Sequence, residues 1–187
     1  MKKLILVIWL SLILTALYAQ TKTGNKFSCD KSVSKITYMM NHPLHSWSGV
    51  SKDVTAIIIT NDAKTELEGV AVATKVVNFD SENANRDSHM MEVTEAIKYP
   101  IITFKSTSIK RVGENNFKIT GRITFHGVSQ EITTDAIRTT TGGKTQVTGT
   151  FSVKISAFKI PIPSLMGIPC TDEIKLIYDV TFINSMI

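Results

Sequence analysis

Apolar and polar residues alternate along most of this chain, and this period of two constrains its fold more than any other feature. In residues 117–125 apolar side chains and one glycine take the odd positions, while lysine, arginine and threonine take the even ones. The same alternation runs through residues 147–155 and 174–182. Successive side chains of a β-strand point to opposite faces of its sheet, so this spacing is typical of strands with one buried face and one wet face.

Eight segments carry the alternation or an equivalent apolar run and are predicted to be strands. Short clusters of Asn, Asp and Gly separate them, for example at 61–62, 113–116 and 142–143, and such clusters favour tight turns between antiparallel neighbours. There is no alternation of strands with helices and no glycine-rich phosphate loop, which excludes a doubly wound nucleotide-binding fold. The predicted strands are 36–40, 54–60, 67–77, 101–109, 117–125, 131–139, 147–155 and 174–182.

One segment has helical spacing instead. Met90, Val93, Thr94 and Ile97 recur at i, i+3, i+4 and i+7, which predicts a short helix over residues 87–98. Asp87 is placed as its N-cap, and Pro100 would end it.

A single antiparallel sheet of eight strands must protect its edges and bury its apolar face, and closure into a barrel does both. We therefore expect an all-β, eight-stranded antiparallel β-barrel with one short helix. A barrel of this size holds either side chains alone or one small ligand.

The first residues have the pattern of a secretory signal peptide. Lys2 and Lys3 precede an apolar run that begins at Leu4, and Ala19 provides a small residue at its end. We expect residues 1–19 to be removed, leaving residues 20–187 as one domain that is secreted into the periplasm. The alternative is an uncleaved anchor, but the run is shorter than the ~20 apolar residues of a bilayer span.

The charge of the chain carries little functional information once that segment is set aside. The full sequence has a formal net charge of +5. Without residues 1–19 it has 19 basic and 16 acidic side chains, a net charge of +3. The lysines are scattered and form no stripe with aromatic residues, so we do not expect nucleic acid as a partner.

Five motifs occur in the order found in the YceI family. They lie within residues 30–49 (Asp, Ser, alternating apolar residues, His, Ser-Gly), 85–90 (Asn-Arg-Asp-Ser-His-Met), 99–106 (Tyr-Pro-Ile-Ile-Thr-Phe-Lys-Ser), 119–129 and 172–174 (Asp-Glu-Ile). The chain thus resembles this family of secreted, lipocalin-like barrels that bind polyisoprenoids or other lipids. It departs from the family's usual pattern at Trp47, in residues 156–158 and in the proline-rich segment 160–169, all of which affect the mouth of a pocket.

The resemblance implies an apolar cavity that holds the tail of a long-chain isoprenoid, a quinone or a fatty-acyl lipid. Period two alone does not distinguish such a cavity from a filled core, so both interpretations stay open. The expected partners are an amphiphilic lipid, an envelope membrane or protein in transient contact, and a second copy in a homodimer. The residues expected to contact the ligand are Ile36, Tyr38, Met40, His42, Phe104, Phe117, Ile119, Ile123, Phe125, Phe151, Leu165, Met166, Leu176 and Tyr178.

The segment 160–169 contains three prolines and cannot be a regular central strand. It could fold over the barrel mouth and contact ligand, cover one end as core, or form an exposed patch that meets a membrane or a protein. The last option supports an alternative function, an envelope interaction module that binds no lipid.

No other group of residues indicates chemistry. The four histidines lack ligand spacing, and no nucleophile motif is visible, so we expect no metal, no resident cofactor and no catalysis. His42, Arg86, Asp87 and His89 are predicted either to brace a turn and a helix start or to contact a lipid headgroup. The only two cysteines, Cys29 and Cys170, could pair in an oxidising compartment, although the barrel would place them at opposite ends.

Overall fold

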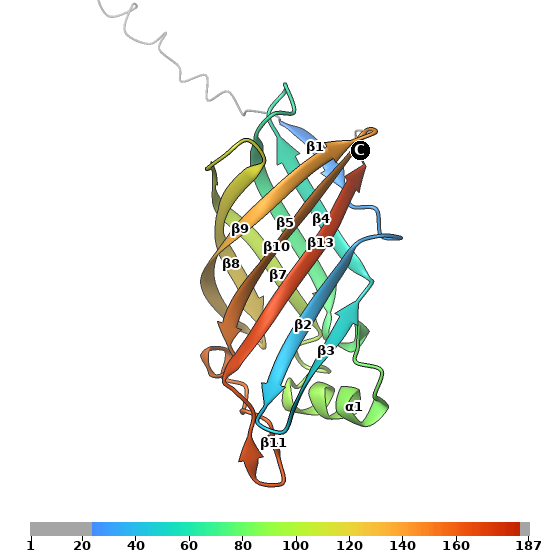
Figure 1. The fold of residues 1–187 in the computed structure, drawn as a ribbon, viewed down its shortest axis with the longest axis vertical. Coiled ribbons are helices and arrows are strands. Elements are labelled where there is room, and N and C mark those ends of the chain that lie inside the picture. Colours follow the sequence, from blue (N-terminus) through green and yellow to red (C-terminus); the bar gives the residue numbers. More distant parts are fainter. Residues whose placement is uncertain (1–23, 184–187) are drawn as a thin grey trace, which may run out of the picture.

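The computed structural model describes residues 24–183, so the predicted signal peptide lies outside the described residues. The described chain is built from β-strands with one α-helix and two short 3₁₀ helices (Figure 1). The large sheet contains β1 (Asn25–Ser28), β2 (Lys35–His42), β3 (His45–Ser51), β4 (Val54–Thr60), β5 (Leu67–Lys75), β6 (Phe79–Asp80), β7 (Ile101–Arg111), β8 (Asn116–Phe125), β9 (Val128–Thr141), β10 (Lys144–Lys154) and β13 (Glu173–Ile183). The other elements are η1 (Val76–Asn78), α1 (Ala84–Val93), η2 (Ser156–Phe158), β11 (Ser164–Leu165) and β12 (Ile168–Pro169).

The large sheet has eleven strands, not the eight expected, in the order β1-β4-β5-β7-β8-β9-β10-β13-β2-β3-β6, with all neighbours antiparallel. Each of the eight predicted segments overlaps a strand, although residues 76–77 of the predicted 67–77 lie in η1. The prediction missed β1, β3 and β6. Two of these are too short to show a period, and the sequence of β3, His-Ser-Trp-Ser-Gly-Val-Ser, is largely polar.

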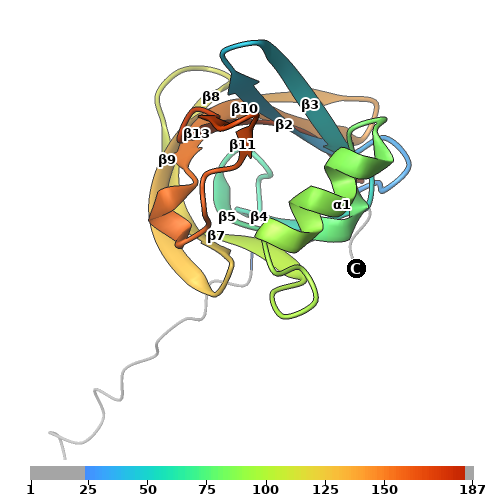
Figure 2. The same cartoon turned by 90° about the horizontal axis from the view of Figure 1, so that it is seen from below.

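The sheet curls into a partial barrel, which corrects the expectation of full closure. Its two end strands, β1 and β6, do not pair with each other in the described chain. At one end the chain after the edge strand β1 approaches the last residues of β13, beyond the part of β13 that pairs with β2. An isolated bridge joins Cys29 and Phe182 there, and the amide of Asp30 donates to the carbonyl of Thr181 at 2.7 Å. At the other end β2, β3 and β6 extend the sheet, and α1 lies across the opening (Figure 2).

Helix α1 begins earlier and ends earlier than predicted. Its N-cap is Asn83, whose side chain accepts a hydrogen bond from the amide of Arg86 at 3.0 Å, so Asp87 lies in the first turn instead. The helix stops at Val93 because Glu95 adopts a positive φ of 46°. Ile97 is consequently fully exposed and contributes nothing to an apolar helical face.

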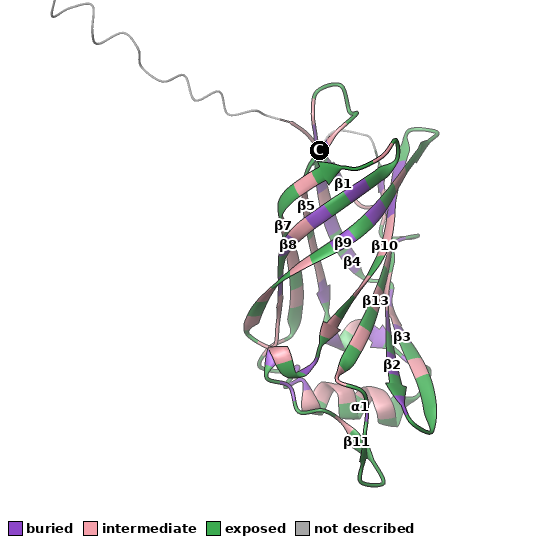
Figure 3. Ribbon diagram, turned by 60° about the vertical axis from the view of Figure 1, so that its left-hand side comes forward, coloured by how far each residue is buried: buried purple, intermediate pink, exposed green. Residues whose placement is uncertain are grey.

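The buried apolar residues form two clusters. Along the long strands, buried or half-buried positions alternate with exposed ones (Figure 3). The first cluster includes Phe27, Phe117 and Phe182 and lies at the end where β1 meets β13. The second cluster includes Tyr38 and Phe158 and lies towards α1 and η2. Members of both clusters line the candidate site.

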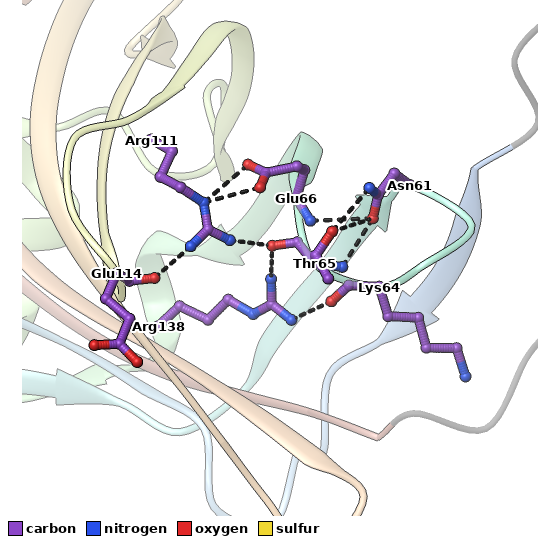
Figure 4. A network of polar contacts seen from close by, with 7 residues as sticks. All are labelled: Asn61, Lys64, Thr65, Glu66, Arg111, Glu114 and Arg138. Carbon is purple, nitrogen blue, oxygen red and sulfur yellow. Dashed lines mark hydrogen bonds and ion pairs between the residues drawn. The ribbon is translucent and has the colours of Figure 1, made fainter.

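An arginine network surrounds the β4–β5 loop (Figure 4), at the end of the sheet away from α1 (Figure 1). Arg138 and Arg111 both donate to the backbone carbonyl of Thr65, and Arg111 Nε lies 2.9 Å from a carboxylate oxygen of Glu66. Asn61 caps the same loop by accepting from the amide of Thr65 at 2.8 Å. The network fixes the β4–β5 loop over the core below it.

The two cysteines are free thiols, so the structure contains no bridge between them. Cys29 Sγ accepts from the amide of Ala56 at 3.1 Å, beside β4. Cys170 is buried at the other end of the sheet, and burial raises the pKa of its thiol. No helix among residues 24–183 is long and apolar enough to cross a membrane.

Candidate binding cavity

An apolar cavity of about 210 Å³ lies inside the curled sheet, counted as the space open to the centre of a water molecule. One water needs only roughly 10–15 Å³ of such space, so the cavity is far larger than a packing void. Many of the side chains that point inward are half-buried and not fully buried, among them Phe104, Phe151 and Leu176. The interior is therefore a cavity and not a filled core.

Ten of the fourteen residues predicted to contact a ligand line this cavity. They come from β2, β7, β8, β10 and β13, whose inward faces share one interior. The ten are Ile36, Tyr38, Met40, Phe104, Ile119, Ile123, Phe125, Phe151, Leu176 and Tyr178. Their role as ligand contacts stays a prediction.

The other four predicted residues lie elsewhere. Phe117 is buried in the core at the closed end, where the guanidinium of Arg111 lies 5.0 Å from its ring centroid. Alternation gives Phe117 the same face as Ile119 but does not say how deep in the barrel each one lies. Leu165 and Met166 are exposed, and His42 is buried in a hydrogen-bonded turn.

His42 braces the turn between β2 and β3. Its Nδ1 accepts from the amide of Leu44 at 3.2 Å, which leaves Nε2 to donate to the carbonyl of Ile168 at 3.0 Å. Both ring nitrogens are therefore used, and of the two predicted roles for this residue the structure shows the bracing one.

Three inward-facing aromatic rings lie against glycines of neighbouring strands. A Cβ on Gly49 would overlap the ring of Tyr38, and a Cβ on Gly149 would overlap the phenol of Tyr178. A Cβ on Gly121 would lie 2.5 Å from Cζ of Phe104. Because these positions lack side chains, the rings lie flat along the wall, and the space in front of them stays open.

The cavity has a polar end at α1. Arg86 and His89 are the only Asp, Glu, Lys, Arg or His side chains among its described lining residues. One guanidinium nitrogen of Arg86 donates to the carbonyl of Ser81 at 3.3 Å, and the guanidinium lies 5.3 Å from the ring of Trp47. His89 is exposed, so the cavity opens towards solvent here.

Asp87 stabilises the backbone and is not among the residues that line the cavity. Both of its carboxylate oxygens accept from the amide of Ser81 at 3.2 Å, which fixes the chain just before α1. The polar cluster predicted from sequence is thus divided: His42 and Asp87 brace the backbone, while Arg86 and His89 face the cavity.

Two tyrosine hydroxyls supply polar atoms along the wall. Burial raises the pKa of both Tyr38 and Tyr178. Deeper in the cavity, Tyr178 Oη lies 3.1 Å from Oγ1 of Thr134, which itself donates to the carbonyl of Thr150 at 3.1 Å. The rest of the wall is almost entirely hydrocarbon.

The proline-rich segment 160–169 has two parts: its first residues line the cavity, and its last residues form an exposed hairpin. Ile160 and Pro163 line the cavity and close its end beside η2. Beyond them, β11 and β12 form a hairpin that projects from the molecule (Figure 1), with Leu165 and Met166 exposed at its tip.

Sequence reasoning missed a further group of lining residues on β3, β5, β6 and α1. Trp47, Val70, Val72 and Phe79 lie in strands that were unpredicted or that were not assigned to the wall, and Met90 lies on the helix that covers the mouth. The alternation in β5 could have shown Val70 and Val72. Nothing local indicates that α1 covers the opening, because that depends on the tertiary position of the helix. Among residues 24–183, no group of three His, Cys, Asp or Glu side chains could hold a metal ion.

The fold and the site together define a class: a β-protein whose curled antiparallel sheet encloses an apolar pocket with one polar mouth. The chain belongs to the YceI-like domain family, whose pattern it matches over residues 27–182. This is the family expected from the five sequence motifs.

The curated relatives match only part of the chain. A UPF0312 protein of Azotobacter vinelandii is 31% identical over 100 residues, which cover 52% of this chain and 52% of the relative. A UPF0312 protein of Pseudomonas putida is 30% identical over 122 residues, which cover 64% of this chain and 60% of the relative.

Solved structures with the same fold match more of it. BcnA of Burkholderia cenocepacia superposes with a TM-score of 0.74 at 21% identity, covering 82% of this chain and 98% of BcnA. The YCEI protein of Campylobacter jejuni gives a TM-score of 0.63 at 27% identity, covering 71% and 82%. A polyisoprenoid-binding domain from Saccharophagus degradans, implicated in plant cell wall breakdown, gives 0.66 at 11% identity, covering 83% and 97%.

Proposed function

We propose that this protein binds a long-chain amphiphilic lipid, namely a polyisoprenoid, a quinone or a fatty-acyl lipid, with the tail inside the cavity. The observation that carries the proposal is the cavity itself, whose wall is almost purely apolar and whose basic side chains, Arg86 and His89, stand at one end. Transfer of each methylene from water into such a site gains ~0.8 kcal/mol, so a tail of about ten carbons can supply micromolar binding or better. The description of the Saccharophagus degradans neighbour as polyisoprenoid-binding is consistent with this proposal.

The headgroup would lie at the α1 end. Arg86 keeps donors beyond the one used on Ser81, and His89 is exposed beside it. No Asp or Glu lines the described cavity to oppose a negative headgroup. A lipid with an acidic or strongly hydrogen-bonding head is therefore favoured over one with a cationic head.

We further propose that the protein acts by binding, without catalysis, and that it does so in the periplasm after removal of residues 1–19. The binding role is supported by a wall that, apart from Arg86 and His89 at one end, offers hydrocarbon surface, two tyrosine hydroxyls and four threonines. The hydroxyls of Thr74, Thr94 and Thr134 are already engaged with protein partners. The location rests on the pattern of the first residues alone. Amino-terminal sequencing of the protein from its native host would test it, with Gln20 expected as the first residue.

The test of binding compares two tryptophan substitutions on adjacent residues of β10. Val153 lines the cavity and Ser152 is exposed on the other face. Mass spectrometry of an organic extract of purified protein should show a stoichiometric lipid. Titration with a fluorescent fatty acid should give wild-type affinity for Ser152→Trp and an affinity reduced at least tenfold for Val153→Trp. Equal affinities for the two variants, or no lipid and no probe binding by the wild type, would overturn the proposal.

Arg86→Gln tests the position of the headgroup. The variant should weaken binding of a fatty acid severalfold and leave binding of the corresponding fatty alcohol unchanged, since only the acid carries a charge. An equal loss for both ligands would show that Arg86 acts by supporting the loop at Ser81.

A further inference from the structure

The hairpin formed by β11, β12 and the Met166-Gly167 turn between them, here called the rim hairpin, is apolar and exposed. Leu165, directly opposite Ile168 in the ladder, is 43% exposed, and Met166 is 86% exposed. Residues 160–171 contain no Asp, Glu, Lys or Arg. Exposing a contiguous apolar loop to water is unfavourable in free energy, so such a loop marks a surface that is covered by a partner or a membrane when the protein functions.

The backbone conformation of the turn makes Met166 an unexpected residue at its position. Met166 has a φ of 53° and Gly167 a φ of 77°, so both central residues of this two-residue loop have positive φ. Such turns favour Asn-Gly or Asp-Gly, which fit the backbone and are soluble. Met166 is neither suited to a positive φ nor soluble when exposed. A residue that is unfavourable both for the backbone and for contact with water points to a functional role at this position.

The rim hairpin is held in place at its base. The amide of Cys170 donates to the carbonyl of Pro163 at 2.8 Å, and the amide of Thr171 donates to the carbonyl of Asn41 at 2.9 Å. His42 connects the hairpin to the β2–β3 turn, because its Nε2 donates to the carbonyl of Ile168 and its Nδ1 accepts from the amide of Leu44. A two-stranded hairpin is only marginally stable alone, so these bonds are what keep it projecting.

The hydrogen bonds of His42 bring the β2–β3 turn beside the hairpin, and the exposed apolar residues of the two segments together are here called the rim. Leu44 is 62% exposed on the β2–β3 turn that His42 connects to the hairpin, and Ile162 is 38% exposed at its base. Leu165, Met166 and Ile168 are exposed as well. The hairpin, the β2–β3 turn and α1, which carries the polar end of the cavity, lie at the same end of the molecule (Figure 1). Pro163 belongs to both features, since it lines the cavity and begins the hairpin.

We propose that this rim docks the protein on a phospholipid membrane, with the hairpin tip inserted among the acyl chains and the cavity mouth facing the bilayer. The inference deepens the proposed function, on which it rests, by naming the membrane as the surface from which the lipid is taken or to which it is delivered. Residues 160–171 carry no charged side chain, so no charge has to be desolvated when the hairpin tip enters the hydrocarbon of the bilayer. Five exposed apolar side chains are far fewer than the roughly 20–30 residues per side of a standard protein interface, which disfavours a second copy or a protein partner.

The experiment uses the mature full chain and phosphatidylcholine vesicles that carry a fluorescent fatty-acyl lipid. The test variant is Leu165→Ser/Met166→Ser. The matched control is Val112→Ser/Ile137→Ser, which removes two exposed apolar side chains that are 58% and 53% exposed on β-hairpins at the opposite end. Vesicle co-flotation and the rate of lipid transfer from vesicle to protein are measured for all three proteins. Binding of the same probe delivered as a soluble monomer is measured in parallel.

We expect the wild type and the control to float with vesicles, and the rim variant to lose at least about tenfold in vesicle affinity and in transfer rate, with unchanged binding of the soluble monomer. Equal flotation of the rim variant and the wild type would overturn the inference. The inference would also be overturned if the wild type bound the soluble probe but not vesicles. The same holds if the rim substitutions only dissociated a dimer and left vesicle binding unchanged. Vesicle binding without any probe binding would instead overturn the proposed function and leave the docking role standing.

Discussion

The phenol ring of Tyr178 lies against Gly149, its cross-strand partner between β13 and β10. A Cβ at Gly149 would overlap the phenol and would also lie 2.6 Å from the carbonyl oxygen of Asp135. The hydroxyl of Tyr178 meanwhile bonds to Thr134. The glycine thus determines where an aromatic side chain of the cavity wall can lie.

Gly149→Ala should destabilise the protein by about 1–3 kcal/mol, because the added methyl forces the ring and the strand apart. Urea unfolding would measure the change. In a Tyr178→Leu background the same substitution should cost less, since part of the overlap has been removed. If its cost is the same in both backgrounds, the ring contact is not the cause.

Arg111→Met should loosen the closed end of the sheet. The variant loses the bonds to Glu66 and to the carbonyl of Thr65, and we expect a loss of about 1–2 kcal/mol in unfolding free energy. Hydrogen exchange of the amides in residues 61–66 should accelerate while the amides of α1 keep their rates. Lys110→Met, on the adjacent and exposed position of β7, is the control and should change neither.

Asp172 should give the protein a defined acid dependence. Its carboxylate accepts from the hydroxyl and the amide of Ser156, the latter at 2.8 Å, and these bonds hold the pKa of Asp172 below its ordinary value of 3.8. A carboxyl group with a lowered folded-state pKa contributes stability above its unfolded pKa, and the contribution is lost as the pH falls through the folded pKa.

Comparison of the wild type with Asp172→Asn by thermal unfolding would check this sign. The wild type should be the more stable protein at neutral pH, and the difference should shrink as the pH is lowered from about 4 towards 2. A difference that stayed constant over that range would show that the charge of Asp172 is not involved.

His126 connects the segment after α1 with η2. Its Nε2 lies 2.8 Å from a carboxylate oxygen of Glu95, its Nδ1 lies 2.9 Å from the carbonyl oxygen of Phe158, and its ring meets that of Tyr99 edge-on at 4.6 Å. The backbone of His126 has a φ of 50°, which Asn tolerates better than most residues do.

His126→Asn should therefore keep the turn but lose the bridge, lowering stability by about 1 kcal/mol. Amide exchange should rise in both connected segments, residues 95–99 and η2. Glu95→Gln, which retains an acceptor for the ring, is the matched variant and should have a smaller effect. Faster exchange in only one segment of His126→Asn would contradict a bridging role.

The strands were predictable because their signal is local. Alternation along 117–125 or 174–182 is a property of adjacent residues, and the sheet reproduces it pair by pair in β8 and β13. The helix boundaries were less so, since Asn83 and Asp87 are both good N-caps and the choice depends on how the chain leaves β6.

The sequence by itself determined that this is an antiparallel β-protein of the YceI-like family and which side chains face inward on its long strands. Only the tertiary structure decided that the interior is open, because a cavity depends on the distance between walls and on rings lying flat over Gly49 and Gly149. It also decided that Phe117 fills a core while Phe104 faces space, and that the rim hairpin projects. Burial of a side chain depends on what packs against it from distant parts of the chain, and no local pattern contains that information.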